Sequence, residues 1–240
     1  VFVFILPFIE QSPLADQYNA KYAPYPTQTG ASRRSWQHSD MTSIYQTPVK
    51  TFQCSSAQNP RVDSFTDSTY GLIDQIATSD YASVSSVNIG CAPCANDSGL
   101  LQRVYTTGDR FGILQPNAST KVPAVADGMS NSLLFVEDAG RPGNWEAMVQ
   151  NTAKRASGGS WPDDSNNFAL DGYSSDGKTK GGSCAVNCNN SNEIYSFHMS
   201  GSNVVFGDGA VRFLKSSVPI GTVAALITRS ADDYPDPSTY

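Results

Sequence analysis

The chain has 240 residues, a net charge of −6 and a charged fraction of only 16%. Its longest basic run is Arg33-Arg34, which excludes the clustered Lys and Arg surface that nucleic acid requires. The low charged fraction is typical of a secreted or surface-exposed protein. No apolar run reaches the ~20 residues of a membrane-spanning helix.

The first 46 residues change from apolar to polar. The apolar run at 1–8 contains Pro7, and it predicts a buried strand or an edge element. Because the sequence starts inside this run without Met, we expect it to begin within a longer protein. Ser12-Pro13 is typical of a helix start, with Pro at the first helical position. The polar residues 20–46 predict an excursion from the core.

Three later segments have strand patterns. Residues 47–54 and 80–89 alternate apolar and polar side chains, as half-buried strands do. Residues 133–136 form a short apolar run after the turn signal Asp127-Gly128. The following segment, 140–192, has little periodicity, and loops of this length are usually functional or mobile.

The tail has the clearest pattern. Residues 193–198, 203–207 and 210–215 predict the three strands of an antiparallel meander. Asp208-Gly209 predicts a type I′ turn, which needs positive φ at both central positions. Residues 219–229 predict a helix with an apolar stripe. Strands that do not alternate with helices favour one α+β domain over 1–240.

Five cysteines leave several interpretations open. Cys91 and Cys94 form a C-x-x-C, and Cys184 and Cys188 are a second close pair, so each pair is a candidate for a local disulfide in an oxidising compartment. The alternatives are a structural zinc held by four thiolates, or free buried thiols. A redox-active C-x-x-C needs a preceding strand and a following helix, which the polar flanks disfavour. We expect Cys54 to be the unpaired cysteine.

Blocks along nearly the whole chain resemble motifs of the large bacterial family DUF1559, which is abundant in Planctomycetes. His198, nine residues and then Asp208-Gly209 resemble its H-x9-DG signature. Met199-Ser200 replaces the usual Pro-Gly, and Gly207 the usual Ala, which leaves the predicted hairpin intact. Further blocks resemble its LPYxEQ, F-x-C, T-D-Y-x-G, D-G-T-S-N-T-L-L and C-x-I-N-C-T-N…NEIYSFH segments, at 6–11, 52–54, 80–82, 127–134 with Glu137 after it, and 184–198.

This resemblance implies a pilin-like, antiparallel α+β domain of the prepilin or type II secretion pseudopilin kind, whose hydrophobic N-terminal helix is absent from this sequence. The implied function is a non-enzymatic subunit of an extracellular filament or a secretion-associated surface assembly. Its partners would be like subunits or other pilin-like proteins, with membrane contact only through the absent helix. We expect the segments 20–46 and 140–192 to form its recognition surface. The domain would face the periplasm before assembly and the cell exterior afterwards.

The signature residues are expected to be structural rather than catalytic. In the predicted sheet, His198 faces Asn203, and Asp208 lies about five residues or ~17 Å further along that strand, so the two are not expected to act together. We expect Asp208-Gly209 to close a turn, and His198 to bond backbone or a nearby carboxylate. Ser130 and Asn131, after Asp127-Gly128, predict a turn whose side chains bond the backbone.

Two enzymatic alternatives remain open. A serine hydrolase could use Ser130 with His198 or His38, although Ser130 lacks the closing Gly of a nucleophile elbow. A glycosidase needs two separated carboxylates, whereas Asp163-Asp164 and Glu137-Asp138 are sequence neighbours that point apart on a strand.

Ligand binding is a further alternative. Calcium prefers oxygen ligands from flexible loops, and the stretch 161–176 offers them without matching an EF-hand. The candidate calcium ligands are Asp163, Asp164, Asn166 and Asp171. Exposed aromatic side chains could stack on sugar rings, which makes a polysaccharide- or solute-binding module the second functional hypothesis. Most of these aromatics are expected to pin loops to the core instead: Trp36, Tyr45, Trp145, Trp161 and Tyr173.

Overall fold

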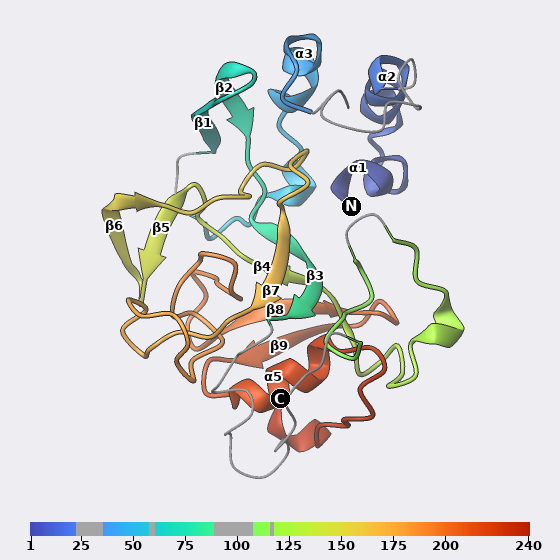
Figure 1. Ribbon diagram of the computed structural model, residues 1–240, viewed down its shortest axis with the longest axis vertical. Coiled ribbons are helices and arrows are strands. Elements are labelled where there is room, and N and C mark those ends of the chain that lie inside the picture. The colour runs from blue at the N-terminus through green and yellow to red at the C-terminus, as the bar shows by residue number, and fades with distance from the viewer. Residues whose placement is uncertain (23–35, 58–60, 89–107, 116–117) are drawn as a thin grey trace.

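The computed structural model describes residues 1–22, 36–57, 61–88, 108–115 and 118–240, and in these it confirms an α+β fold. A five-stranded sheet lies below a group of short helices and a two-stranded hairpin (Figure 1). The helices are α1 (Phe2–Ile5), α2 (Ser12–Tyr22), α3 (Thr42–Tyr45) and α5 (Ile220–Ile227), with 3-10 turns η1 (Leu6–Ile9), η2 (Ser39–Met41), η3 (Lys50–Phe52), η4 (Val122–Ala124) and η5 (Pro237–Thr239).

The main sheet has the strand order β7-β3-β4-β8-β9. All its pairs are antiparallel except β7 with β3, which is parallel, so the expectation of a wholly antiparallel sheet is wrong at this edge. The long connection between these two strands allows the chain to return in the same direction. The strands are β3 (Tyr81–Val87), β4 (Leu133–Glu137), β7 (Asn167–Leu170), β8 (Gly201–Phe206) and β9 (Val211–Lys215).

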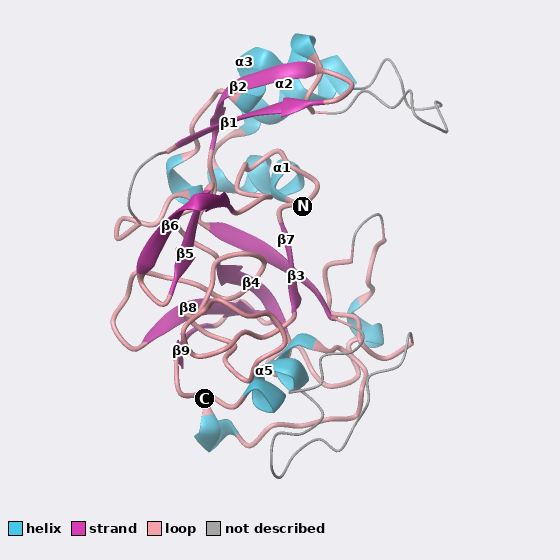
Figure 2. Cartoon of the chain, turned by 60° about the vertical axis from the view of Figure 1, so that its left-hand side comes forward, coloured by secondary structure: helices cyan, strands magenta, loops and turns pink. Residues whose placement is uncertain are grey.

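Helix α5 covers one face of this sheet, as Figure 2 shows. All eight of its residues are buried, and Thr222 is the one polar side chain among them, as expected of a helix buried on all sides. The predicted helix at 219–229 is thereby confirmed. The core between helix and sheet includes Val84, Val136, Phe168, Phe206, Val223 and Leu226.

A second core lies under the N-terminal helices. Phe2 and Leu6, one helical turn apart, are buried there against Phe52 and Trp161. The predicted strand at 1–8 is therefore wrong, because this run buries its apolar residues at helical spacing. The predicted strand at 47–54 is also wrong: its centre is the 3-10 turn η3, which places Phe52 in this core.

Two hairpins complete the architecture. Strands β1 (Val62–Asp67) and β2 (Gly71–Ala77) form one, and β5 (Gly143–Glu146) and β6 (Val149–Arg155) form the other. Neither hairpin was predicted. The segment 140–192 has little periodicity in its sequence, but it contains the strands β5, β6 and β7. Of the excursion 20–46, the helical turns η2 and α3 are described, and residues 23–35 lie outside the described part.

The tail forms a hairpin rather than a three-stranded meander. Strand β8 pairs with β9 on one side and with β4 on the other, so the predicted strand at 193–198 has no place in the ladder. That segment instead makes single bridges at Ile194 and Tyr195. Gly209 alone has positive φ (86°) in the turn, and its N–H donates to Phe206 O at 2.9 Å. The turn is therefore not type I′, but it matches a three-residue hairpin loop that ends in a left-handed glycine.

Candidate functional site

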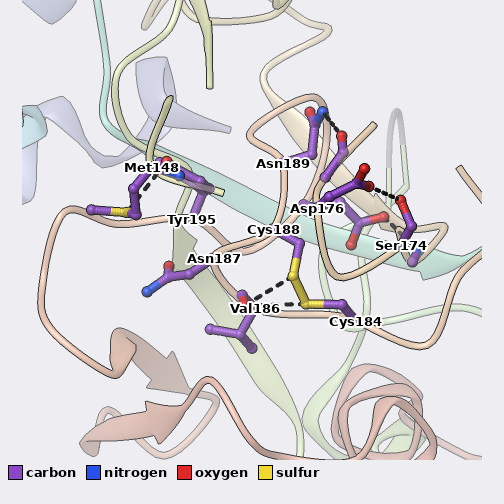
Figure 3. The surroundings of a disulfide bond; sticks show 12 residues. Met148, Ser174, Asp176, Cys184, Val186, Asn187, Cys188, Asn189 and Tyr195 are labelled. Carbon is purple, nitrogen blue, oxygen red and sulfur yellow. Dashed lines mark hydrogen bonds between the residues drawn. A yellow bond between two sulfur atoms is a disulfide. The ribbon is translucent and has the colours of Figure 1, made fainter. Parts of the chain in front are cut away.

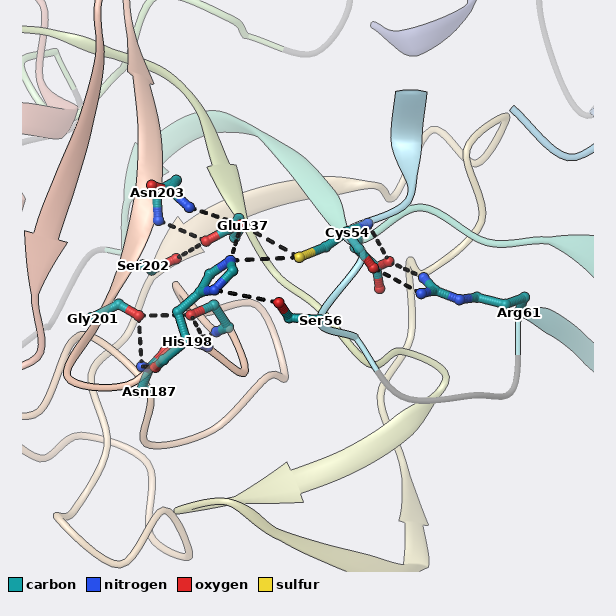
Figure 4. Close-up of polar contacts among 11 residues, drawn as sticks. Cys54, Ser56, Arg61, Glu137, Asn187, His198, Gly201, Ser202 and Asn203 are labelled. Atoms are coloured by element: carbon teal, nitrogen blue, oxygen red, sulfur yellow. Dashed lines mark hydrogen bonds and ion pairs between the residues drawn. The ribbon is translucent and has the colours of Figure 1, made fainter. Parts of the chain in front are cut away.

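Three polar side chains from distant parts of the sequence meet beside the main sheet (Figure 4). The Sγ atom of Cys54 lies 3.6 Å from Nε2 of His198 and 3.7 Å from Oε1 of Glu137. Nε2 of His198 lies 3.1 Å from the same Oε1. We call these three residues the Cys–Glu–His cluster.

Cys54 is fixed by its backbone. It follows the turn η3, and its N–H donates to Oδ2 of Asp80 at 2.8 Å. Arg61 forms an ion pair with the same carboxylate and donates to the carbonyl of Cys54 at 2.7 Å. Because Asp80 directly precedes β3, these bonds tie the cysteine segment to the start of that strand.

Glu137 is the last residue of β4, and its side chain is 1% exposed. A buried carboxylate needs donors to compensate for lost hydration. Oε2 accepts from the hydroxyl of Ser202 at 3.0 Å and from the N–H of Asn203 at 2.6 Å, both on β8. The pairing of β4 with β8 therefore supplies these donors and leaves Oε1 facing the histidine and the thiol.

His198 lies just before β8, with its side chain 29% exposed. Its N–H donates to the hydroxyl of Ser196 at 3.1 Å. On the ring, Nδ1 lies 3.5 Å from the hydroxyl of Ser56, at the long limit of a hydrogen bond. The ring thus bridges a buried carboxylate and an exposed hydroxyl.

The cluster does not have the geometry of a cysteine hydrolase. In a catalytic relay the nucleophile and the acid contact opposite nitrogens of the imidazole. Here Cys54 and Glu137 both face Nε2. Burial raises the pKa of the Cys54 thiol, and the nearby carboxylates of Glu137 and Asp80 act in the same direction, so a free thiolate is disfavoured.

The hydroxyl beside Nδ1 of the His198 ring belongs to Ser56, and not to the predicted candidate Ser130. Ser130 is exposed in the turn after Gly128, which has a φ of 93°. In that turn Asn131 donates to the carbonyl of Asp127 at 3.0 Å, as the structural interpretation expects. A hydrolase role for Ser130 stays an untested prediction.

The other signature residues lie in two neighbouring turns. Asp127 is buried, and its carboxylate accepts from the N–H groups of Ala231 and Asp232 at 2.8 and 3.0 Å. Asp208 accepts from the N–H of Ala210 at 2.9 Å, and its own N–H donates to the carbonyl of Met129 at 3.1 Å. Because Asp208 and His198 lie at opposite ends of β8, they do not act as a pair.

The predicted calcium ligands are spread along a strand. Asp163, Asp164 and Asn166 precede β7, and Asp171 follows it, so one ion could not take both groups across a four-residue strand of about 13 Å. Oδ1 of Asn166 accepts from Arg141 at 3.0 Å, and Asp171 pairs with Lys180 at 2.7 Å. Calcium binding stays a prediction that the arrangement does not favour.

Cys184 and Cys188 form a disulfide, which confirms this part of the cysteine prediction (Figure 3). Their sulfurs are then not available as thiolates for a four-cysteine zinc site. Cys91 and Cys94 lie outside the described residues. Within the disulfide loop, Asn187 accepts from the N–H of Ser196 at 2.8 Å and donates to the carbonyl of Gly201 at 3.0 Å. The disulfide loop therefore supports the segment that carries His198.

The five aromatic residues considered for sugar stacking are all buried, and so they act as packing groups: Trp36, Tyr45, Trp145, Trp161 and Tyr173. For example, the indole N–H of Trp161 donates to the carbonyl of Thr47 at 2.9 Å. These side chains pin surface segments to the two cores.

Sequence reasoning named His198 as structural and overlooked its two partners as site residues. The available signal was that Cys54, Glu137 and His198 each belong to a separate block that resembles a family motif. Their convergence depends on η3 and on the β4–β8 pairing, neither of which a local pattern predicts.

Comparison with known proteins gives one match. Residues 2–221 match the model of a family described as "Protein of unknown function (DUF1559)". No curated protein and no solved structure matches the chain. In the described part of the chain, no helix has the length and apolar character needed to cross a membrane. The disulfide indicates an oxidising compartment.

Proposed function

Because this chain belongs to the DUF1559 family over nearly its whole length, we propose that it is the displayed domain of a non-enzymatic, pilin-like surface subunit. Its partners are like subunits or other pilin-like proteins. Its place is outside the cytoplasm, which the Cys184–Cys188 disulfide supports. The signature turns at 127–132 and 207–209 hold the sheet together in this proposal and carry no reactive group.

The observation that carries the proposal is an exposed apolar face at the N-terminal helices. Phe4 and Phe8 are 80% and 86% exposed, while Phe2 and Leu6 on the other side of the same turns are buried. Burying one phenylalanine side chain contributes about 1.5–3 kcal/mol. Two such side chains, one helical turn apart, form a hydrophobic contact surface of the kind that marks protein–protein interfaces.

Self-association of the purified chain tests the proposal. We expect the sedimentation coefficient to rise with protein concentration, and the double variant Phe4→Ser, Phe8→Ser to remove this rise while the melting temperature is preserved. The matched control is Leu72→Ser, because Leu72 is 68% exposed on the β1–β2 hairpin. A monomer at every concentration, or an equal effect of the control, would count against an assembly role for this face.

A solute- or polysaccharide-binding module is the second candidate. Two hollows of about 470 and 290 Å³ lie along β6, and Lys178 borders both. They fall within the segment 140–192, where we expect the recognition surface. A glycan array on the folded chain separates the two functions, since a pure assembly subunit gives no saturable signal.

A further inference from the structure

We propose that the Cys–Glu–His cluster is a binding site for a divalent transition metal ion, with zinc as the best fit. The ligand atoms would be Sγ of Cys54, Oε1 of Glu137 and Nε2 of His198, which all lie within 4.8 Å of one another. This site is independent of the proposed assembly function. It also differs from a four-cysteine zinc site, because it uses none of the other four cysteines.

The spacing of the three atoms matches a tetrahedral zinc ion. Zinc bonds are about 2.3 Å long to sulfur, 2.05 Å to nitrogen and 2.0 Å to oxygen. With tetrahedral angles between these bonds, the ligand atoms are separated by about 3.55 Å (S to N), 3.5 Å (S to O) and 3.3 Å (N to O). The corresponding distances in the structure are 3.6, 3.7 and 3.1 Å. The ligands therefore need to move by only a few tenths of an ångström.

The donor set also selects the metal. One thiolate, one imidazole and one carboxylate suit zinc, which accepts sulfur, nitrogen and oxygen. Calcium and magnesium prefer oxygen ligands and would gain little from the sulfur and the nitrogen. Three protein ligands leave one tetrahedral position for a water molecule or a ligand from solvent.

Neighbouring residues hold the ligands in position, as in established metal sites. Glu137 is oriented through Oε2 by Ser202 and by the N–H of Asn203. His198 has Ser56 beside Nδ1, which leaves Nε2 for the metal. Asp80 and Arg61 hold the backbone of Cys54 in place, so its sulfur can bind the ion without a change in backbone conformation.

Binding is a simple exchange at the sulfur. The S–H bond of Cys54 breaks, its proton goes to solvent, and the electron pair forms the sulfur–zinc bond. Oxidation states do not change, and no other reactant is needed. The bound ion also removes the free thiol in a compartment where thiols are otherwise oxidised.

Metal binding by the full chain tests the site. After treatment with a chelator, the chain is titrated with Zn²⁺ by calorimetry, and with Co²⁺ by absorption spectroscopy. We expect one ion per chain, a dissociation constant in the micromolar range or below, a thiolate-to-cobalt charge-transfer band and a raised melting temperature. The variants Cys54→Ser and His198→Ala should weaken binding at least 100-fold, and Cys54→Ser should abolish the band.

The control is His38→Ala, which removes the other histidine of the chain and should bind as the unchanged protein does. Circular dichroism establishes that each variant is folded. Zinc held by Cys91 and Cys94 would persist in Cys54→Ser, so retained binding in this variant overturns the proposal. The proposal is also overturned if the folded, reduced chain binds no Zn²⁺ at about 100 micromolar. It is overturned as well if peptide mapping finds Cys54 in a disulfide in the native protein.

Discussion

Replacement of Arg141 by Met should be among the most destabilising single changes in this protein. The Arg141 side chain is fully buried, and it pairs with the equally buried Asp138 at 3.2 Å. It also donates to the carbonyls of Asp138 and Gly158 at 2.9 Å and to Oδ1 of Asn166 at 3.0 Å. One guanidinium thus joins the residue that follows β4, the backbone at Gly158 and the turn before β7.

The cost of Arg141→Met depends on pH because Asp138 can take up a proton. Burial raises the pKa of Asp138 to about 7, even though Arg141 opposes this shift. Below pH 7 the variant loses hydrogen bonds to buried acceptors, at about 2 kcal/mol. Above pH 7 Asp138 is charged in the unchanged protein but keeps its proton in the variant, where no cation compensates it. Each further pH unit then adds about 1.4 kcal/mol to the difference.

We therefore expect Arg141→Met to lower the free energy of unfolding by about 2 kcal/mol at pH 5.5 and by about 4 kcal/mol at pH 8.5. Urea unfolding followed by tryptophan fluorescence measures both values. The matched control is Arg212→Met, because Arg212 stacks on Phe206 at 4.3 Å but is partly exposed, and it should cost under about 1 kcal/mol at either pH. A loss below about 1 kcal/mol at pH 8.5, or an equal loss at both pH values, would refute this reasoning.

Two further changes test other buried groups. Burial raises the pKa of Glu193 well above its ordinary value, so the folded state holds a proton that the unfolded state has lost, and stability falls as the pH rises above the ordinary carboxyl range. Glu193→Gln keeps an oxygen for the two backbone N–H groups that Oε1 binds. This variant should flatten the dependence of the melting temperature on pH between about 5 and 7, whereas the control Glu10→Gln, at an exposed position, should not. Equal slopes in the two variants would show that Glu193 is ionised in the folded protein. Replacing Cys184 and Cys188 by Ala opens a disulfide loop with a sequence separation of 4. We expect this to lower the free energy of unfolding by about 2 kcal/mol, measured with urea under non-reducing conditions. An unchanged unfolding midpoint would contradict this expectation.

The sequence by itself determined the elements whose pattern is local. The alternation at 80–89 and the apolar run at 133–136 predicted β3 and β4, and the apolar stripe at 219–229 predicted α5. Their burial is more complete than these patterns imply, because six of the seven β3 residues and all eight α5 residues are buried. The Asp208-Gly209 dipeptide correctly predicted a hairpin turn between β8 and β9, although not its type. The motif blocks identified the family, since they extend over nearly the whole chain.

Only the tertiary structure decided which segments meet. The apolar run at 1–8 and the alternating run at 47–54 both have local strand patterns, but both form helical turns that place Phe2, Leu6 and Phe52 in the core that contains Trp161. The segment 193–198 has a strand pattern, but β4 already occupies the edge of β8 that it would need. Cys54, Glu137 and His198 are up to 144 residues apart and share no local period. Their proximity follows from the β4–β8 register and from the bonds of Asp80, which are long-range pairings that no window of sequence contains.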